Sequence, residues 1–329
     1  MKSVLWYRYT NLCKVIDLVL CKLYKTNVHE KIAEQQSNGK VGANKVFMEK
    51  RHFMLYDDVY VRYKRILHTK SRYERGLKMN KLSKDYLRYT FLIMIICWGI
   101  CLLCSLNGTS LNDNYLLYVP YLLGGWSPTI ASFWALKKND KVVNFKDWIK
   151  KVFDFKHNIF SYLMVIALGI LFIVPQCLIS GYENGAPLFA IIVMIPVMLI
   201  GGGLEEAGWR YILQPELEKK YKFVISTLIV SVIWWLWHLP LFYIQGVSQY
   251  GQNYLAFGIN ILGLAFTLAS IRKNTDSVWL CVLFHCIANS LSGIYIINEN
   301  ILGNIVTTII LIISSLVLVR VNNEKKIFS

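Results

Sequence analysis

The sequence predicts an all-α membrane protein: a bundle of about eight transmembrane helices with a polar site inside the membrane and both termini in the cytoplasm. Three observations support this prediction. The 329 residues are 55% hydrophobic, with a mean hydropathy of +0.40, and are therefore more apolar than a typical soluble chain. Eight apolar segments each approach the roughly 20 residues that a helix needs to cross hydrocarbon. The segments between them alternate in charge, which is typical of a polytopic protein.

The N-terminal region, 1–87, has a different composition. It holds 19 Lys/Arg against 8 Asp/Glu, with many aromatic residues between them, and its apolar runs are too short to span a membrane. Charges at Lys14, Asp17 and Lys22 interrupt the first of these runs, so it does not resemble a signal peptide. We predict a basic cytoplasmic extension over 1–87 that lies on anionic lipid, followed by a polytopic membrane domain over 88–329.

The predicted spans are 89–106, 115–136, 158–179, 187–203, 223–244, 254–271, 278–297 and 301–320. The connection 107–114 has no lysine or arginine, whereas 137–156 has seven lysines and three aspartates. The later connections continue this alternation, which by the positive-inside rule places both termini in the cytoplasm. Apolar residues recur at helical spacing among the lysines of 142–156, which predicts an amphipathic helix on the inner leaflet.

Neither the charge nor the cysteines indicate a nucleic-acid or zinc-finger protein. The formal net charge of +16 is concentrated in the N-terminal region and the connections, and no nucleic-acid recognition motif accompanies it. The eight cysteines lack zinc-finger spacing. Cys101 and Cys104 lie inside an apolar run, where reduced, buried thiols are the expectation.

The segment Gly201-Gly-Gly-Leu-Glu-Glu-Ala-Gly-Trp-Arg210 places ionisable residues directly after a predicted span. Such residues at membrane depth are costly and usually face a polar interior. On a helix, Glu206 and Arg210 are four residues apart and can pair, which leaves Glu205 directed elsewhere as a candidate general base. The alternative is an ion pair at the cytoplasmic end of a helix. The three glycines favour close approach of another helix.

Two later spans carry one histidine each. His238 follows a run of tryptophans, and it is either a functional residue or a structural histidine in an interfacial aromatic belt. His285 and Asn289 are four residues apart and project from one helix face, where they can hold a water, a metal or an oxyanion, or instead bridge two helices. Together with Glu205 they form a set that can activate water and stabilise a tetrahedral oxyanion.

These residues resemble the CAAX-protease and bacteriocin-processing (CPBP, or Abi) family of intramembrane proteases. The resemblance rests on Glu205-Glu206-x-x-x-Arg210, the aromatic residue ahead of His238, and His285-x-x-x-Asn289, in that order. The Gly124-Gly-Trp-Ser-Pro128 turn and the spacing from Leu262 to Asn289 are also similar. The resemblance covers about 89–300. The family commonly has phenylalanine where this chain has Trp234.

The resemblance implies an eight-helix bundle whose site lies inside the membrane and opens toward the cytoplasm. It implies peptide-bond hydrolysis, with Glu205 as the base that activates water and Asn289 steadying the oxyanion. His238 and His285 would ligate Zn²⁺ or act directly on the water, since glutamate catalysis without metal is also allowed. Glu206 and Arg210 would shape the site. The expected substrates are peptides or protein tails at the inner leaflet.

Two alternatives and one geometric requirement follow from this prediction. The same charges in a non-enzymatic immunity factor or transporter would bind a peptide or an ion, and a pure scaffold would need no buried polar set. Glu205 is predicted near the inner end of its span and His238 about 22 Å along the next one. The two meet only if the fifth helix starts well outside the bilayer or is strongly tilted. The Lys/Ile/Asn-rich composition favours a bacterial plasma-membrane protein.

Overall fold

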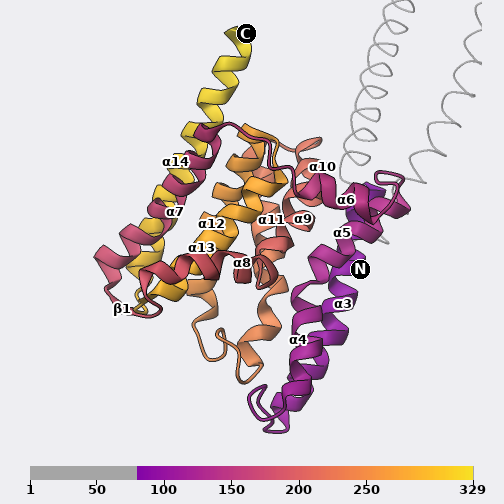
Figure 1. The fold of residues 1–329 in the computed structure, drawn as a ribbon, viewed down its shortest axis with the longest axis vertical. Coiled ribbons are helices and arrows are strands. Elements are labelled where there is room, and N and C mark those ends of the chain that lie inside the picture. The colour runs from indigo at the N-terminus through magenta and orange to yellow at the C-terminus, as the bar shows by residue number, and fades with distance from the viewer. Residues whose placement is uncertain (1–79, 329) are drawn as a thin grey trace, which may run out of the picture. The chain divides into compact units, whose positions relative to one another are not determined.

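The computed structural model describes residues 80–328, with side chains described over 80–322, and the chain there is mostly helical (Figure 1). Its longer helices and strands are α3 (Lys81–Leu106), α4 (Tyr118–Gly125), α5 (Ser127–Lys138), α6 (Phe145–Val152), α7 (Ile159–Ser180), β1 (Tyr182–Asn184), α8 (Ile191–Ile200), α11 (Phe223–Trp237), α12 (Tyr254–Thr275), α13 (Val278–Ile294), β2 (Tyr295–Ile297) and α14 (Ile301–Phe328). The predicted extension lies outside the described residues except for its last few positions. The first membrane helix, α3, already begins at Lys81.

The chain is a multi-pass membrane protein by the length and composition of its helices. In the described part, five helices are long and apolar enough to cross a membrane: α3, α7, α11 with the turn that follows it, α12 and α14. A sixth span is formed if the two halves of a helix pair, Leu188–Ile200 and Gly203–Glu218, bent by 43°, count as one. Side chains on the outside of these helices are large and apolar, for example Ile95 and Leu103, both more than 60% exposed.

Two of the eight predicted segments do not form a single helix of the length expected for a span. The segment predicted at 115–136 divides at Trp126 into α4 and α5. Pro128 lies in the first turn of α5, a position where a proline is accepted because no helical partner exists for its nitrogen. The segment predicted at 278–297 forms a helix of 17 residues, α13.

The fourth predicted segment, 187–203, is the first half of the bent pair. After α8 the chain turns at Gly202, whose φ is 149°, a value that residues with a side chain rarely adopt. It continues through a 3₁₀ turn (Gly203–Glu205), a short helix α9 (Glu206–Gly208), a π-helical turn (Trp209–Leu213) and α10 (Gln214–Glu218). Irregular backbone at membrane depth occurs where it is buried in protein or lines a cavity.

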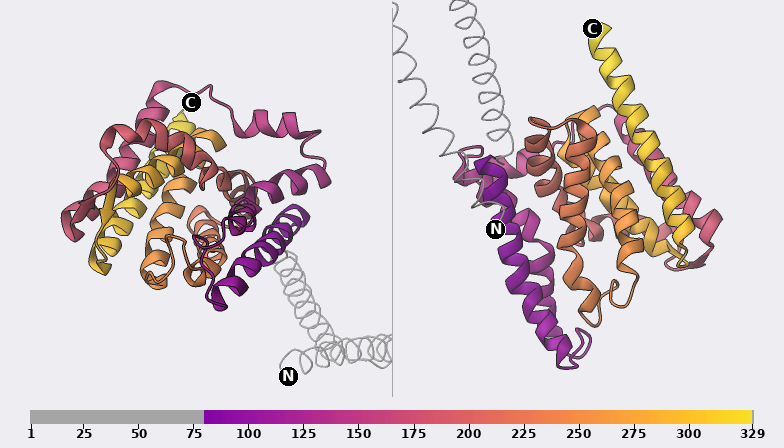
Figure 2. Two further views of the ribbon diagram at one scale, coloured as in Figure 1. Left: turned by 60° about the horizontal axis from the view of Figure 1, so that its bottom comes forward. Right: turned by 180° about the vertical axis from the view of Figure 1, so that it is seen from behind.

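The bundle has two chemically different ends. We call the end formed by 137–158, 219–222 and 272–277 the basic end, and the end formed by 107–117, 181–187, 244–253 and 295–300 the loop end. Every lysine and arginine of these connections lies at the basic end, while the loop end has three acidic residues and no basic one. The views in Figures 1 and 2 place α10 and the C-terminus of α14 toward one end, and β1 toward the other.

Contacts between connections define each end. At the loop end, the backbone N–H of Leu111 donates to the Gln245 carbonyl at 3.1 Å, and β1 pairs antiparallel with β2. At the basic end, the Lys273 ammonium lies 2.5 Å from a Glu218 carboxylate oxygen. The helices therefore run alternately from one end to the other.

The amphipathic helix predicted over 142–156 is present as α6. Asn144 caps it by accepting a hydrogen bond from the backbone N–H of Asp147 at 3.0 Å. Trp148 is buried and donates through Nε1 to the Ser132 hydroxyl at 3.0 Å, which joins α6 to α5. Hydrogen bonds from the Val143 N–H and Lys151 lower the pKa of Asp147. The inner-leaflet position of this helix stays a prediction.

Candidate active site

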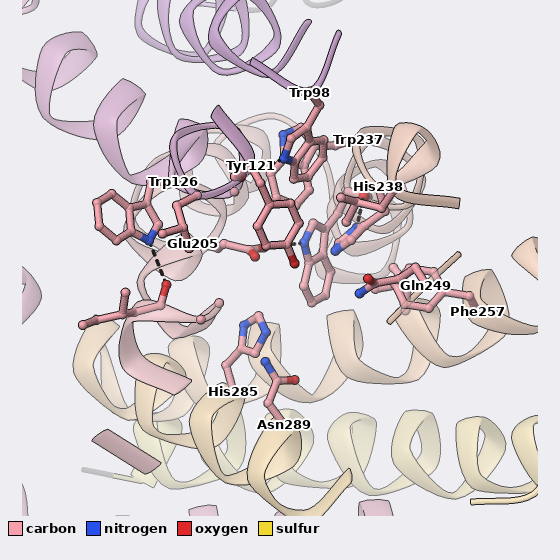
Figure 3. A pocket seen from close by; sticks show the side chains of 18 of the residues that line it. Trp98, Tyr121, Trp126, Glu205, Trp237, His238, Gln249, Phe257, His285 and Asn289 are labelled. Carbon is pink, nitrogen blue, oxygen red and sulfur yellow. Dashed lines mark hydrogen bonds between the residues drawn. The ribbon is translucent and has the colours of Figure 1, made fainter. Parts of the chain in front are cut away.

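A cavity of about 180 Å³ lies where the bent pair, α11 and α13 meet, and all the polar residues singled out by sequence except Glu206 and Arg210 line it. Figure 3 shows Glu205, His238, His285 and Asn289 directed toward the same space from three separate parts of the chain. Aromatic side chains from α3, α4 and α12 form much of the remaining wall. The site is therefore a polar centre inside an apolar enclosure.

Glu205 is held by a tryptophan of α11. The Nε1–H of Trp234 donates to Glu205 Oε2 at 3.0 Å, and both side chains are buried. The indole ring also lies 5.7 Å from the ring centres of both His238 and His285. Trp234 thus contacts all three candidate catalytic side chains. Its hydrogen bond goes to Glu205 Oε2, so Oε1 of the same carboxylate does not take part in it.

Glu206 points away from the cavity into a fully buried ion cluster. Its Oε2 lies 3.2 Å from Arg210 Nε, and its Oε1 lies 2.8 Å from His285 Nδ1. The Arg210 guanidinium also lies over the Trp234 ring at 5.4 Å. The pairing predicted between Glu206 and Arg210 is present, and Glu206 additionally fixes the orientation of His285.

Both histidines use Nδ1 for orientation and leave Nε2 for the cavity. The His238 Nδ1–H donates to the Trp234 carbonyl at 2.8 Å, because a carbonyl can only accept. In the neutral ring, Nε2 of His238 is consequently a hydrogen-bond acceptor. His285 has the same arrangement when its Nδ1–H donates to the Glu206 carboxylate. Each Nε2 can accept a proton or a hydrogen bond from a bound water.

The backbone of Gly202 passes close to the polar centre. A β-carbon built at Gly202 would lie 2.9 Å from Asn289 Nδ2, 3.3 Å from His285 Nε2 and 3.7 Å from Glu205 Oε1. These three groups therefore converge on one small space that only a glycine leaves open. Gly203 serves the close helix approach predicted from sequence, since a β-carbon there would lie 2.4 Å from Cys286 Sγ of α13.

The predicted geometric difficulty between Glu205 and His238 does not arise. Glu205 is at the bend of a span that continues to Glu218, so it lies at mid-bundle rather than at an inner end. The fifth helix, α11, begins at Phe223 and needs no extension outside the bilayer. The sequence expectation failed because the apolar run ends at Ile200, while the rest of the broken span is polar and irregular.

Several wall residues were not assigned to the site from sequence. Trp126 closes one side by donating from Nε1 to the Ile200 carbonyl at 2.8 Å, and Gln249 reaches the cavity from the loop end. Trp237 and Phe257 pack on His238, with ring centres 4.7 Å and 5.0 Å away. Tryptophans and phenylalanines in a membrane helix carry no signal that separates a cavity wall from lipid contact.

The residues fit a metal less well than the sequence suggested. Two imidazoles and a carboxylate suit zinc chemically. Within residues 80–322, however, no three side chains of His, Cys, Asp or Glu come together in a way that could hold a metal ion. We therefore derive no reaction step through a metal.

Comparison with known proteins shows which proteins this chain resembles. Residues 187–291 match the model of the type II CAAX prenyl endopeptidase Rce1-like family, a range that includes all six predicted site residues. CAAX prenyl protease 2 of Methanococcus maripaludis is 26% identical over 228 residues, which are 63% of this chain and 82% of that protein. These two matches make the chain similar to CAAX proteases and support the resemblance to the CPBP family. The matched segment runs from the beginning of the bent pair to the last turn of α13.

Proposed function

We propose that the chain is an intramembrane endopeptidase that hydrolyses peptide bonds with a water activated by Glu205. The observation that carries the proposal is the convergence of Glu205, His238, His285 and Asn289 on one enclosed cavity. The similarity to CAAX proteases supports a protease. The substrates we propose are peptides or protein tails that reach the site from the membrane.

In the proposed reaction, each side chain either transfers a proton, orients the water or stabilises a developing charge. Glu205 takes a proton from water as the oxygen bonds to the peptide carbonyl carbon, and His238 Nε2 orients that water as an acceptor. Asn289 Nδ2 donates to the oxyanion of the tetrahedral intermediate. The proton on Glu205 then passes to the leaving nitrogen as the carbon–nitrogen bond breaks. Glu206 and Arg210 hold His285 in place.

All eight apolar segments cross the membrane in this proposal. The α4–α5 pair and α13 each connect the two ends of the bundle, as the five longer helices do, and this supports the count. A plasma-membrane location in a bacterium stays the prediction from composition, and the relative that we identified comes from Methanococcus.

The deciding experiment compares the wild type with Glu205→Gln on a quenched peptide panel that includes CAAX tails with and without a prenyl group. Glutamine keeps the shape and removes the base, so we expect kcat to fall by about 100-fold or more. Glu183→Gln, an exposed carboxylate on β1, is the matched control and should cleave normally. Cleavage that survives Glu205→Gln contradicts the assignment. A chelator arm tests the Zn²⁺ alternative for His238 and His285.

A further inference from the structure

The active-site cavity lies in the half of the bundle next to the loop end. Gln249, in the connection 244–253, forms part of its wall, and on α12 the wall residues start at Phe257, in the first turn of that helix. Trp234 and Trp237 of α11 and the following His238 also line the cavity, about 17–22 Å by helical rise from the start of the helix at the basic end. No residue of 137–158, 219–222 or 272–277 borders the cavity.

Buried side chains close the bundle between the cavity and the basic end. Arg210, Leu213, Gln214 and Ile271 are at most 1% exposed. The Arg272 Nε–H donates to the Arg210 carbonyl at 3.1 Å, which ties the end of α12 to the bent pair at this level. A substrate therefore has no described route to Glu205 from the basic end, whereas Gln249, Leu122 and Ile200 border the cavity on the other side, and all three are half-buried or exposed.

The charges determine which end faces the cytoplasm. All lysines and arginines of the described connections are at the basic end, and short connections rich in these residues stay in the cytoplasm. The family resemblance implies a cavity that opens to the cytoplasm. The charges instead place the basic end in the cytoplasm, and the cavity lies near the other end.

We infer that the active site opens toward the non-cytoplasmic leaflet. This inference rests on the proposed function and specifies its substrates: peptides, or membrane-anchored protein segments, exposed on the outer side of the membrane. The wall that receives them is aromatic and uncharged apart from the catalytic groups, with Tyr121, Trp126 and Phe257 along it. Apolar side chains or chains attached to the substrate fit this wall better than charged ones.

Cysteine labelling tests the orientation independently of catalysis. Ser248→Cys places a thiol on the exposed loop end, and Lys141→Cys places one on the exposed basic end, while the wild type measures background from its own cysteines. In intact cells, a membrane-impermeant maleimide should label Ser248→Cys fully and Lys141→Cys only after lysis. The reverse pattern overturns the inference, whether or not any peptide is cut.

A second measurement tests the opening itself. An impermeant quenched peptide should be cleaved by sealed right-side-out vesicles and spared by sealed inverted vesicles until detergent is added. Cleavage by inverted vesicles alone overturns the inference. Absence of cleavage even in detergent instead counts against the proposed protease function, and the maleimide pattern then still reports the orientation.

Discussion

Trp234 is the residue that contacts Glu205, His238 and His285 together. It donates to Glu205, its carbonyl accepts from His238, and its ring touches His238 and His285. A phenylalanine, common at this position in the family that the chain resembles, fills the same space but donates no hydrogen bond. In this chain one carboxylate oxygen is thereby fixed, and the other is left to act on water.

Replacing Trp234 with phenylalanine should therefore lower kcat by about tenfold with little change in KM, because a hydrogen bond to a charged group is worth about 1.5–3 kcal/mol. Trp235→Phe is the matched control: it removes an indole donor from the same helix, but that donor bonds the Tyr254 carbonyl outside the cavity. Equal losses of kcat in the two variants would show that Trp234 acts only on stability, which thermal unfolding in detergent measures.

Gly202 provides a second prediction at the residue scale. Alanine there would combine an unfavourable φ with a β-carbon 2.9 Å from Asn289 Nδ2, inside the space where the catalytic groups converge. We expect Gly202→Ala to abolish cleavage while the chain remains inserted. Gly251→Ala also has a positive φ, 76°, but meets no atom within 4 Å, so it should remain active. An active Gly202→Ala enzyme would mean that the water binds elsewhere.

At the scale of elements, α6 is a short helix with an N-terminal cap and two buried residues, Trp148 and Val152. Asn144→Ala removes the N-terminal cap and should destabilise α6 by about 1 kcal/mol. Hydrogen exchange of the α6 amides measures this, and Asn144→Ser, which can still cap, should restore protection. Unchanged exchange in the alanine variant would show that the packing of Trp148 and Val152 holds the helix without the cap.

Acid should weaken the same element. Because the pKa of Asp147 is lowered in the folded chain, its contribution is complete above the ordinary aspartate range near 3.8 and is lost as the pH falls through the lower, folded value. We expect the amides of α6 to lose protection from exchange as the pH falls through this range. The Asp147→Asn variant, which lacks the carboxylate at every pH, should not show this acid-induced loss. The α6 amides of the two chains should differ least at the most acidic pH.

At the scale of the whole molecule, the described membrane domain begins with its own helix cap. Asn80 accepts a hydrogen bond from the Ser83 N–H at 2.9 Å and also contacts Glu216 of α10. A chain that starts at Met79 should therefore insert and keep the kcat of the full chain. Loss of cleavage by an inserted, folded chain of this kind would assign part of the function to residues 1–78.

Sequence predicted the helical membrane fold and the burial of the polar side chains that line the cavity, because hydropathy and charged motifs report burial and its cost directly. It placed the Gly124-to-Pro128 turn inside one continuous span and did not predict the break at Gly202, because a hydropathy window does not register a change in backbone direction. It did not identify the wall residue Gln249, since nothing local links a polar loop to a distant cavity. Sequence also did not predict the end of the bundle near which the cavity lies, because this depends on where the broken span bends.

The bend at Gly202 also constrains how the protein is made. The bend leaves backbone groups without helical partners, and lipid offers them none. The surface that covers the bend, around Cys286 on α13, is synthesised about 80 residues later. The bend therefore stays uncovered until α13 has been made. We expect a nascent chain arrested before α13 to be recognised as incomplete and degraded, although most of its spans are already present.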